Sequence, residues 1–189
     1  MNDRPSNPDL AMSVLDRPNS YIGRSVPRPN AARLAQGRGT YVDDIVLPRM
    51  VHLAFCRSPY AHAEILSVDT AEAAALPGVL RVLTMDDLRD VCTPWVGVLD
   101  HLKGIKSAPQ WPLANGKAFF QGEPVVAVVA TSRAIAEDAV DLVEIDYKEL
   151  PAVADMETAL DPATPVIHPE LGDNLCFERR IDAGGVDTA

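Results

Sequence analysis

The stretch Pro124-Val-Val-Ala-Val-Val-Ala130 decides how the rest of the chain must fold. Its side chains are uninterrupted by any charge, which is typical of a central β-strand buried on both faces. The run is far shorter than the ~20 apolar residues that a membrane-spanning helix requires. We therefore expect this stretch to lie at the centre of a sheet in a globular domain.

The segment that follows predicts a helix and then a second strand. Ser132 is placed to cap a helix, and Ile135, Ala139 and Leu142 fall at i, i+4 and i+7 on one stripe of it. Val143-Glu-Ile-Asp-Tyr147 then alternates between apolar and polar residues, as a half-buried strand does. This order predicts a compact β-α-β unit, with a right-handed crossover if its two strands are parallel neighbours.

Shorter elements are predicted on both sides of this unit. In the strand predicted over 51–56, Val51, Leu53 and Phe55 share one face, and we expect this strand to be half buried. The elements are strands over 51–56, 63–69 and 79–83, a helix over 71–76 capped by Thr70, a helix over 85–89 behind a capping box of Thr84 and Asp87, and a short helix over 155–160. Together they predict an α+β fold: a mixed sheet with a β-α-β unit and short helices.

Two parts of the chain lack regular periodicity. Residues 1–36 are rich in Pro, Asn and Arg, which predicts an extended N-terminal arm. Residues 90–118 are interrupted by Pro and Gly and contain both tryptophans, Trp95 and Trp111. Long irregular loops are usually functional or mobile. We expect this loop to pack on a large surface, either of its own domain or of a neighbouring domain or subunit.

Charge and cysteine content restrict the possible functions. The formal net charge of −10 opposes nucleic-acid binding. Residues 1–40 carry a net charge of +3 and residues 41–189, the body of the chain, a net charge of −13. The acidic residues of the body either form an ordinary solvated surface or present an acidic face to a basic partner. The three cysteines are far apart and form no C-x-x-C pair, which opposes zinc or iron–sulfur sites and suits a reducing compartment. No secretory signal is visible, so we expect a cytoplasmic protein.

No residue pattern predicts a self-contained active site. The histidines His52, His62, His101 and His168 lack metal-site spacing, so we interpret each as structural. Glu123 precedes the buried strand; burial would raise its pKa, but we expect it to bond to nearby backbone or to an arginine. Asp43 and Asp44 favour a turn cap over a metal site. We therefore predict that this chain contains no catalytic residue, no cofactor-binding residue and no metal ligand.

Five segments, in their order and spacing, resemble a known family. They are Gly37-Arg-Gly-Thr-Tyr41-Val-Asp-Asp44, Ser58-Pro-Tyr-Ala-His62-Ala63, Leu76-Pro-Gly-Val79, Gln121-Gly-Glu-Pro-Val125 and Asp146-Tyr-Lys-Glu-Leu-Pro151. The chain resembles the N-terminal a/b hammerhead domain of molybdenum hydroxylase large subunits, the family of xanthine dehydrogenase, aldehyde oxidase and aerobic carbon monoxide dehydrogenase. The scaffold positions that match are Gly39, Tyr41, Asp44, Pro77, Gly78, Gly122, Pro124, Tyr147 and Pro151.

The resemblance implies a domain order and a set of cofactors and partners. Residues 1–20 would be a disordered arm, with Ile22-Gly-Arg24 as the family's lead-in; residues 21–180 would be the hammerhead domain, and 181–189 a truncated lead into a molybdenum-binding domain. The complete enzyme would carry molybdenum–molybdopterin cytosine dinucleotide, with iron–sulfur clusters and FAD on partner subunits or domains. It would oxidise or hydroxylate a small molecule with water-derived oxygen, while this chain itself would bind no cofactor.

Two alternatives stay open. The chain is a fragment or split subunit of such an oxidoreductase, or it is a non-catalytic interaction module that binds flavin or iron–sulfur partners. A third possibility, an independent small-ligand domain, conflicts with the family-like order of segments. The substrate is not specified by any residue pattern in this chain.

Overall fold

The computed structural model describes residues 28–97, 99 and 102–181 in two separate units, which divide between Pro48 and Arg49. Predictions about residues 1–27, His101 and 182–189 fall outside the described residues. These include the disordered arm, the lead-in at Ile22-Gly-Arg24 and most of the lead at 181–189.

The first unit contains a short helix where the sequence predicted an extended arm. Helix α1 (Ala31–Ala35) begins after Pro29 and the N-cap residue Asn30, and its Ala-Ala-Arg-Leu-Ala sequence favours helix. Gly37 ends it with a φ of +69°, donating to Leu34 O at 3.0 Å, while Arg38 N–H donates to Arg33 O at 3.0 Å. A 3₁₀ turn follows, η2 (Val42–Asp44).

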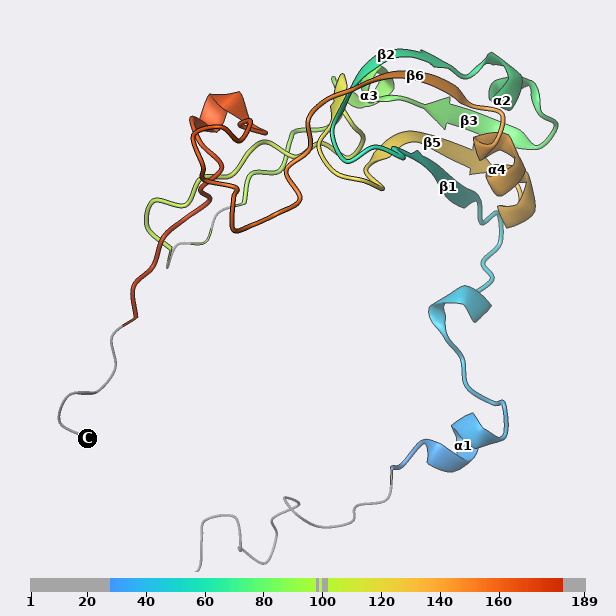
Figure 1. Ribbon diagram of the computed structural model, residues 1–189. Helices are drawn as coiled ribbons and strands as arrows, with labels where there is room; N and C mark the ends of the chain where they lie inside the picture. Colours follow the sequence, from blue (N-terminus) through green and yellow to red (C-terminus); the bar gives the residue numbers. More distant parts are fainter. Residues whose placement is uncertain (1–27, 98, 100–101, 182–189) are drawn as a thin grey trace, which may run out of the picture. The chain divides into compact units, whose positions relative to one another are not determined.

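The second unit contains two three-stranded sheets (Figure 1). The first has the order β1 (His52–Arg57), β5 (Pro124–Ala130), β3 (Val79–Leu83), and the second β4 (Lys117–Ala118), β2 (Ala63–Asp69), β6 (Glu144–Glu149). The helices are α2 (Ala71–Ala75), α3 (Met85–Leu88), α4 (Arg133–Val140) and the 3₁₀ turn η3 (Pro169–Leu171). The predicted α+β class with short helices is confirmed.

The central strand lies where the apolar run placed it. β5 is hydrogen-bonded on both sides, to β1 and β3, and Val126 and Val128 are fully buried. Val128 packs with Ala73 and Ala139 of the helices, while Val126 belongs to a cluster that reaches the second sheet. The unbroken apolar sequence is needed because β5 contacts the helices on one side and other core residues on the other.

The β-α-β succession is arranged differently from the expectation. β5, α4 and β6 follow one another along the chain, but β5 and β6 lie in different sheets. The strand pairings of the described residues are antiparallel. The domain therefore has two small antiparallel sheets where one mixed sheet was expected, and the handedness rule for parallel neighbours does not apply.

Three local predictions need correction. Val51 and Leu53 are 50% and 54% exposed. Val51 lies just before β1, and of the three predicted residues Phe55 is the one that packs against the core cluster of Met85, Leu113 and Ala127. The side chain of Thr70 makes no cap bond; the Oδ1 atom of Asp69 accepts from Ala71 N–H instead, at 2.9 Å.

The helix predicted over 155–160 is absent, since this segment forms only turns. Asp155 Oδ1 accepts the N–H of Glu157 at 2.9 Å, a local bond that competes with helix formation.

Candidate functional site

Three of the family-like segments meet in a single junction. Ser58 N–H donates to the carbonyl oxygen of Glu123 at 2.9 Å, and Gly122 N–H donates back to Ser58 O at 2.8 Å. On the other side of the turn, His62 Nδ1 lies 2.8 Å from Pro151 O. Segments that are 60 to 90 residues apart are thereby fixed to one another, which explains why these motifs occur together.

His62 confirms the structural role that the sequence predicted. Its side chain is only 8% exposed, and besides the contact to Pro151 its backbone carbonyl accepts from Leu150 N–H at 2.9 Å. The ring therefore joins the Ser58–His62 turn to the end of β6. The other ring nitrogen, Nε2, is buried and has no hydrogen-bond partner, as is also true of the hydroxyl of Tyr147.

Burial also changes the acidity of two groups near this junction. Desolvation raises the pKa of Tyr147 to about 12, and the Tyr60 ring packs against it with centroids 5.3 Å apart. Desolvation likewise raises the pKa of the Cys56 thiol. Both groups are therefore held in their neutral forms, so neither is prepared to act as a nucleophile at neutral pH.

Glu123 is half-buried beside the junction. Its Oε2 accepts the backbone N–H of Phe119 at 2.6 Å, which confirms the predicted backbone bond. Burial raises the pKa of this carboxyl, while the N–H groups of Phe119 and Phe120 and the charge of His168 act in the opposite direction. Desolvation is the largest of these effects, so the neighbouring donors and charges do not fully stabilise the ionised carboxylate.

A stack of rings continues from the junction to the C-terminal segment. The centroids of His62 and Phe119 are 5.9 Å apart, and those of Phe119 and His168 are 4.3 Å apart with an interplanar angle of 24°. Phe119 thus lies between two histidines that are distant in sequence. Neither Phe119 nor the partnership with His168 was predicted, because both residues lie in irregular segments where no periodic pattern indicates contacts.

A cleft of about 340 Å³ opens next to Glu123. Three segments form it: 108–111 from the long loop, 115–123 around β4, and 168–170 at η3. Its lining combines aromatic rings with carboxylates, contributed by Trp111, Phe119, Phe120, Glu123 and Glu170. A cleft of this size falls in the range of small-ligand sites.

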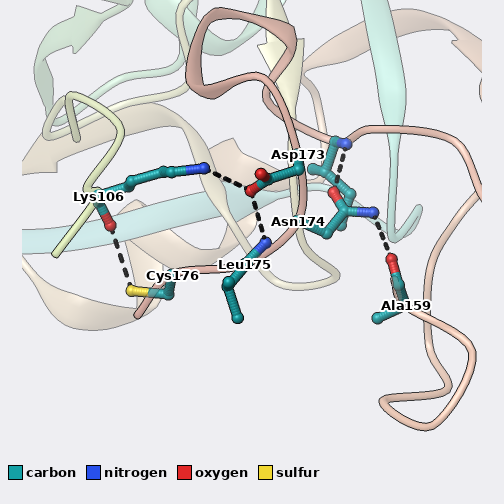
Figure 2. A network of polar contacts seen from close by, with 7 residues as sticks. Lys106, Ala159, Asp173, Asn174, Leu175 and Cys176 are labelled. Atoms are coloured by element: carbon teal, nitrogen blue, oxygen red, sulfur yellow. Dashed lines mark hydrogen bonds and ion pairs between the residues drawn. The ribbon is translucent and has the colours of Figure 1, made fainter. Parts of the chain in front are cut away.

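Polar contacts hold the C-terminal segment against the loop (Figure 2). Lys106 Nζ reaches Asp173 Oδ1 at 2.6 Å, and Lys106 N–H donates to Cys176 O at 2.8 Å. The Lys106 hydrogen bond lowers the pKa of Asp173. The side chain of Asn174 accepts from Ile167 N–H and donates to Ala159 O, at 2.9 and 3.0 Å. These bonds fix the segment that supplies His168 to the cleft.

The two tryptophans of the long loop behave differently. Trp111 packs against the core cluster of Met85, Leu113 and Ala127. Trp95 is 62% exposed, although its backbone pairs with that of Gln110 at 2.8 Å in both directions. The loop thus packs on its own domain through one tryptophan and presents the other to its surroundings.

The described residues contain no group of three or more His, Cys, Asp or Glu side chains that could hold a metal ion. His62 and His168 stack on Phe119, and Asp44 caps the η2 turn by accepting Tyr41 N–H at 2.9 Å. The described residues therefore offer no protein donor set for a metal ion. No described helix is long and apolar enough to cross a membrane.

Gly78 shows why one of the scaffold positions requires its residue. Gly78 has a φ of +97°, and a Cβ atom placed there would lie 2.7 Å from Ile135 Cδ1. Its carbonyl accepts Thr131 N–H at 2.9 Å, so β3 begins in direct contact with the start of α4. Only glycine allows both this backbone conformation and this close approach.

The fold and these motifs together define a protein class. Residues 36–151 match the family described as "Aldehyde oxidase and xanthine dehydrogenase, a/b hammerhead domain". The chain belongs to this family, and the resemblance inferred from its motifs is confirmed.

Among curated relatives, the chain is 41% identical over 154 residues to the carbon monoxide dehydrogenase large chain of Afipia carboxidovorans, covering 82% of this chain and 18% of that one. It is 38% identical to the nicotine 6-hydroxylase large subunit of Paenarthrobacter nicotinovorans, covering 93% of this chain and 22% of the relative. Quinoline 2-oxidoreductase from Pseudomonas putida 86 superposes with a TM-score of 0.74 at 44% identity, covering 82% of this chain and 20% of that one. The chain thus spans about a fifth of the length of these relatives.

Proposed function

We propose that the chain serves as the hammerhead domain of the large subunit of a molybdenum-dependent oxidoreductase that oxidises or hydroxylates a small molecule. The observation that carries this proposal is the match of residues 36–151 to the hammerhead family, joined to identities of 38–41% with large chains of such enzymes. The domain has a scaffolding role: the Ser58–His62 junction fixes its two sheets and its C-terminal segment in one arrangement.

The cofactors belong to the rest of the enzyme. We propose molybdenum–molybdopterin cytosine dinucleotide in the remaining large-subunit domains, with iron–sulfur clusters and FAD on partner subunits or domains. One relative of known structure is a Cu,Mo-CO dehydrogenase, and another relative is the 6-hydroxypseudooxynicotine dehydrogenase complex subunit gamma. The molybdenum group would supply the redox chemistry. The residues of this chain would supply a rigid neighbour, with 21–180 as the domain and 181–189 as its continuation into the next one.

The exposed apolar side chains support a role inside a larger assembly. In the second unit large hydrophobic residues are exposed on several segments, including Leu53 at 54%, Trp95 at 62% and Phe120 at 57%. We propose that neighbouring domains or subunits cover these side chains in the assembly. A cytoplasmic location completes the proposal, supported by free thiols at Cys56, Cys92 and Cys176.

Native purification tests the proposal. The polypeptide that contains this sequence would be isolated from its own cells with an antibody against the chain, and its mass, molybdenum, iron and flavin contents measured. We expect the sequence within, or firmly bound to, a large subunit with stoichiometric molybdenum. A 189-residue polypeptide that purifies alone and without molybdenum would contradict the proposal.

The second candidate function is a non-catalytic interaction module. The exposed Trp95 and the acidic body, with a net charge of −13 over residues 41–189, favour it. In the same purification this module would appear as a separate chain bound to flavin or iron–sulfur subunits. Recovery of the chain without any redox partner would oppose this candidate.

A further inference from the structure

The cleft beside Glu123 has the composition of a cation site. Two carboxylates, Glu123 and Glu170, and the rings of Trp111, Phe119 and Phe120 are among the residues that line it. The lining contains no lysine or arginine, and His168 is its single basic side chain. An acidic, aromatic cleft attracts an organic cation through both Coulomb and cation–π interactions.

Glu123 supplies a fixed negative acceptor in the cleft wall. Its carboxylate accepts the Phe119 N–H at 2.6 Å, so its position in the cleft wall is fixed. Burial outweighs the stabilising N–H groups and raises its pKa, so the ionised form lacks sufficient counter-charge. A bound cation would supply that charge within a partly dehydrated site, where such an interaction is stronger than in open water.

The described cations near the cleft have other partners. Arg89 Nη2 donates to Asp86 Oδ1 at 2.8 Å and to Asn115 Oδ1 at 3.1 Å. His168 Nδ1 lies 3.2 Å from Glu170 Oε1, and its ring stacks on Phe119, so a protonated His168 would be shared between the two carboxylates. Lys117 Nζ lies 6.0 Å above the Phe119 ring and is not among the lining residues.

The aromatic walls favour a flat cation. Phe120 is 57% exposed, so its ring offers free surface, and Trp111 forms part of the same lining. A guanidinium group is planar, permanently charged and rich in donors, so it can stack on a ring while donating to carboxylates. A compact ammonium ion is also attracted to aromatic faces, but it cannot stack flat on a ring while donating to carboxylates at its edge.

We propose that this cleft binds a guanidinium group, with Glu123 and Glu170 as acceptors and Phe120 and Trp111 as stacking surfaces. The group belongs either to a small solute or to an arginine side chain of another polypeptide, and the two share the same recognition chemistry. This inference extends beyond the scaffolding role, which assigns no ligand to the domain.

Titration of the 189-residue chain with methylguanidinium tests the site. The Trp95→Phe variant leaves Trp111 as the single tryptophan, so its fluorescence reports on the cleft. Methylurea, which is neutral and of nearly the same shape, is the matched ligand control. We expect saturable binding of methylguanidinium that weakens with added salt. Methylurea should bind roughly tenfold more weakly or worse, because it cannot form a charge-assisted hydrogen bond.

Two variants locate the binding. Glu123→Gln keeps an oxygen that can accept the Phe119 N–H and should weaken methylguanidinium binding about tenfold, and Glu170→Gln should weaken it by a smaller factor because Glu170 is more exposed. Glu137→Gln, an exposed change on α4, is the control and should leave binding unchanged. Thermal unfolding of each variant verifies that it is folded.

The ligand's source is distinguished by comparing methylguanidinium with the peptide Gly-Gly-Arg-Gly-Gly. Equal or tighter binding of the peptide supports an arginine of a partner polypeptide, whereas binding of methylguanidinium alone supports a small solute. Absence of binding by both, equal binding of methylurea, or an unchanged affinity in both folded Glu123→Gln and Glu170→Gln variants would overturn the proposal. The result is independent of molybdenum content, so it can fail without affecting the proposed scaffold function.

Discussion

At the scale of single residues, the absence of a Cβ atom at position 78 allows β3 to approach α4 closely. The missing Cβ of Gly78 leaves room for Ile135, and the φ of +97° suits only glycine. Among charged residues, Glu123 has a comparable structural role. Its carboxylate accepts the Phe119 N–H, although burial raises its pKa. Both residues belong to family-like motifs, and both have structural reasons for their identity.

Replacing Gly78 by alanine should destabilise the domain by about 2 kcal/mol, because backbone strain adds to overpacking against Ile135. The free energy of unfolding in urea would measure it. Gly116→Ala is the control, since Gly116 has a φ of +73° but nothing within 4 Å of an added Cβ, so only the strain remains. Equal effects of the two substitutions would show that the contact with Ile135 is unimportant.

The raised pKa of Glu123 predicts a pH-dependent stability. A carboxyl whose pKa is higher in the folded state stabilises the fold when protonated, and this contribution is lost as pH rises from the unfolded value near 4.5 through the raised one. The stability of the wild type relative to Glu123→Gln should therefore decrease between acidic and neutral pH. Urea unfolding at a series of pH values measures this difference, and an increase with pH would contradict the assignment.

At the scale of elements, short helices depend on their caps because so few internal hydrogen bonds are available. Ser132 Oγ accepts the N–H of Ile135 at 3.3 Å at the start of α4, as the sequence predicted. At α3, the carboxylate of Asp87 accepts the N–H of Thr84 at 2.7 Å, and this bond lowers the pKa of Asp87. At α2, Asp69 makes the bond that was expected of Thr70.

Removing the Ser132 cap should destabilise the domain by about 1 kcal/mol in the Ser132→Ala variant. Ser132→Asp keeps an acceptor at the same position and should retain most of the stability. Thermal unfolding followed by circular dichroism compares the two variants with the wild type. An alanine variant as stable as the aspartate variant would show that α4 is held by packing alone.

At the scale of the whole molecule, the C-terminal segment is held mainly by side chains in irregular structure. Asn174 bonds to Ile167, Ala159 and Pro165, each at 2.9 to 3.0 Å. The Lys106–Asp173 ion pair is partly exposed and contributes little by itself. The wall of the cleft that carries His168 therefore depends on Asn174 more than on that ion pair.

The Asn174→Ala variant should loosen this segment locally. We expect the Ile167 amide to exchange with solvent at least about tenfold faster, because it loses its acceptor. The Val128 amide in β5 should be unaffected. Hydrogen exchange measured by NMR compares the two amides, with Asp173→Asn as the control that should change little. Unchanged exchange at Ile167 would contradict the role of Asn174.

The sequence by itself determined the central strand 124–130, the caps at Ser132 and Thr84, the α+β class and the family, because these depend on local periodicity, capping chemistry and motif order. It also indicated a structural role for His62 and a bond from Glu123 to nearby backbone or to an arginine. Only the tertiary structure decided that β5 and β6 enter different sheets, since strand pairing depends on contacts distant in sequence. The cleft, too, came from the tertiary structure, because Phe119 and His168 meet through irregular segments whose contacts follow no sequence period.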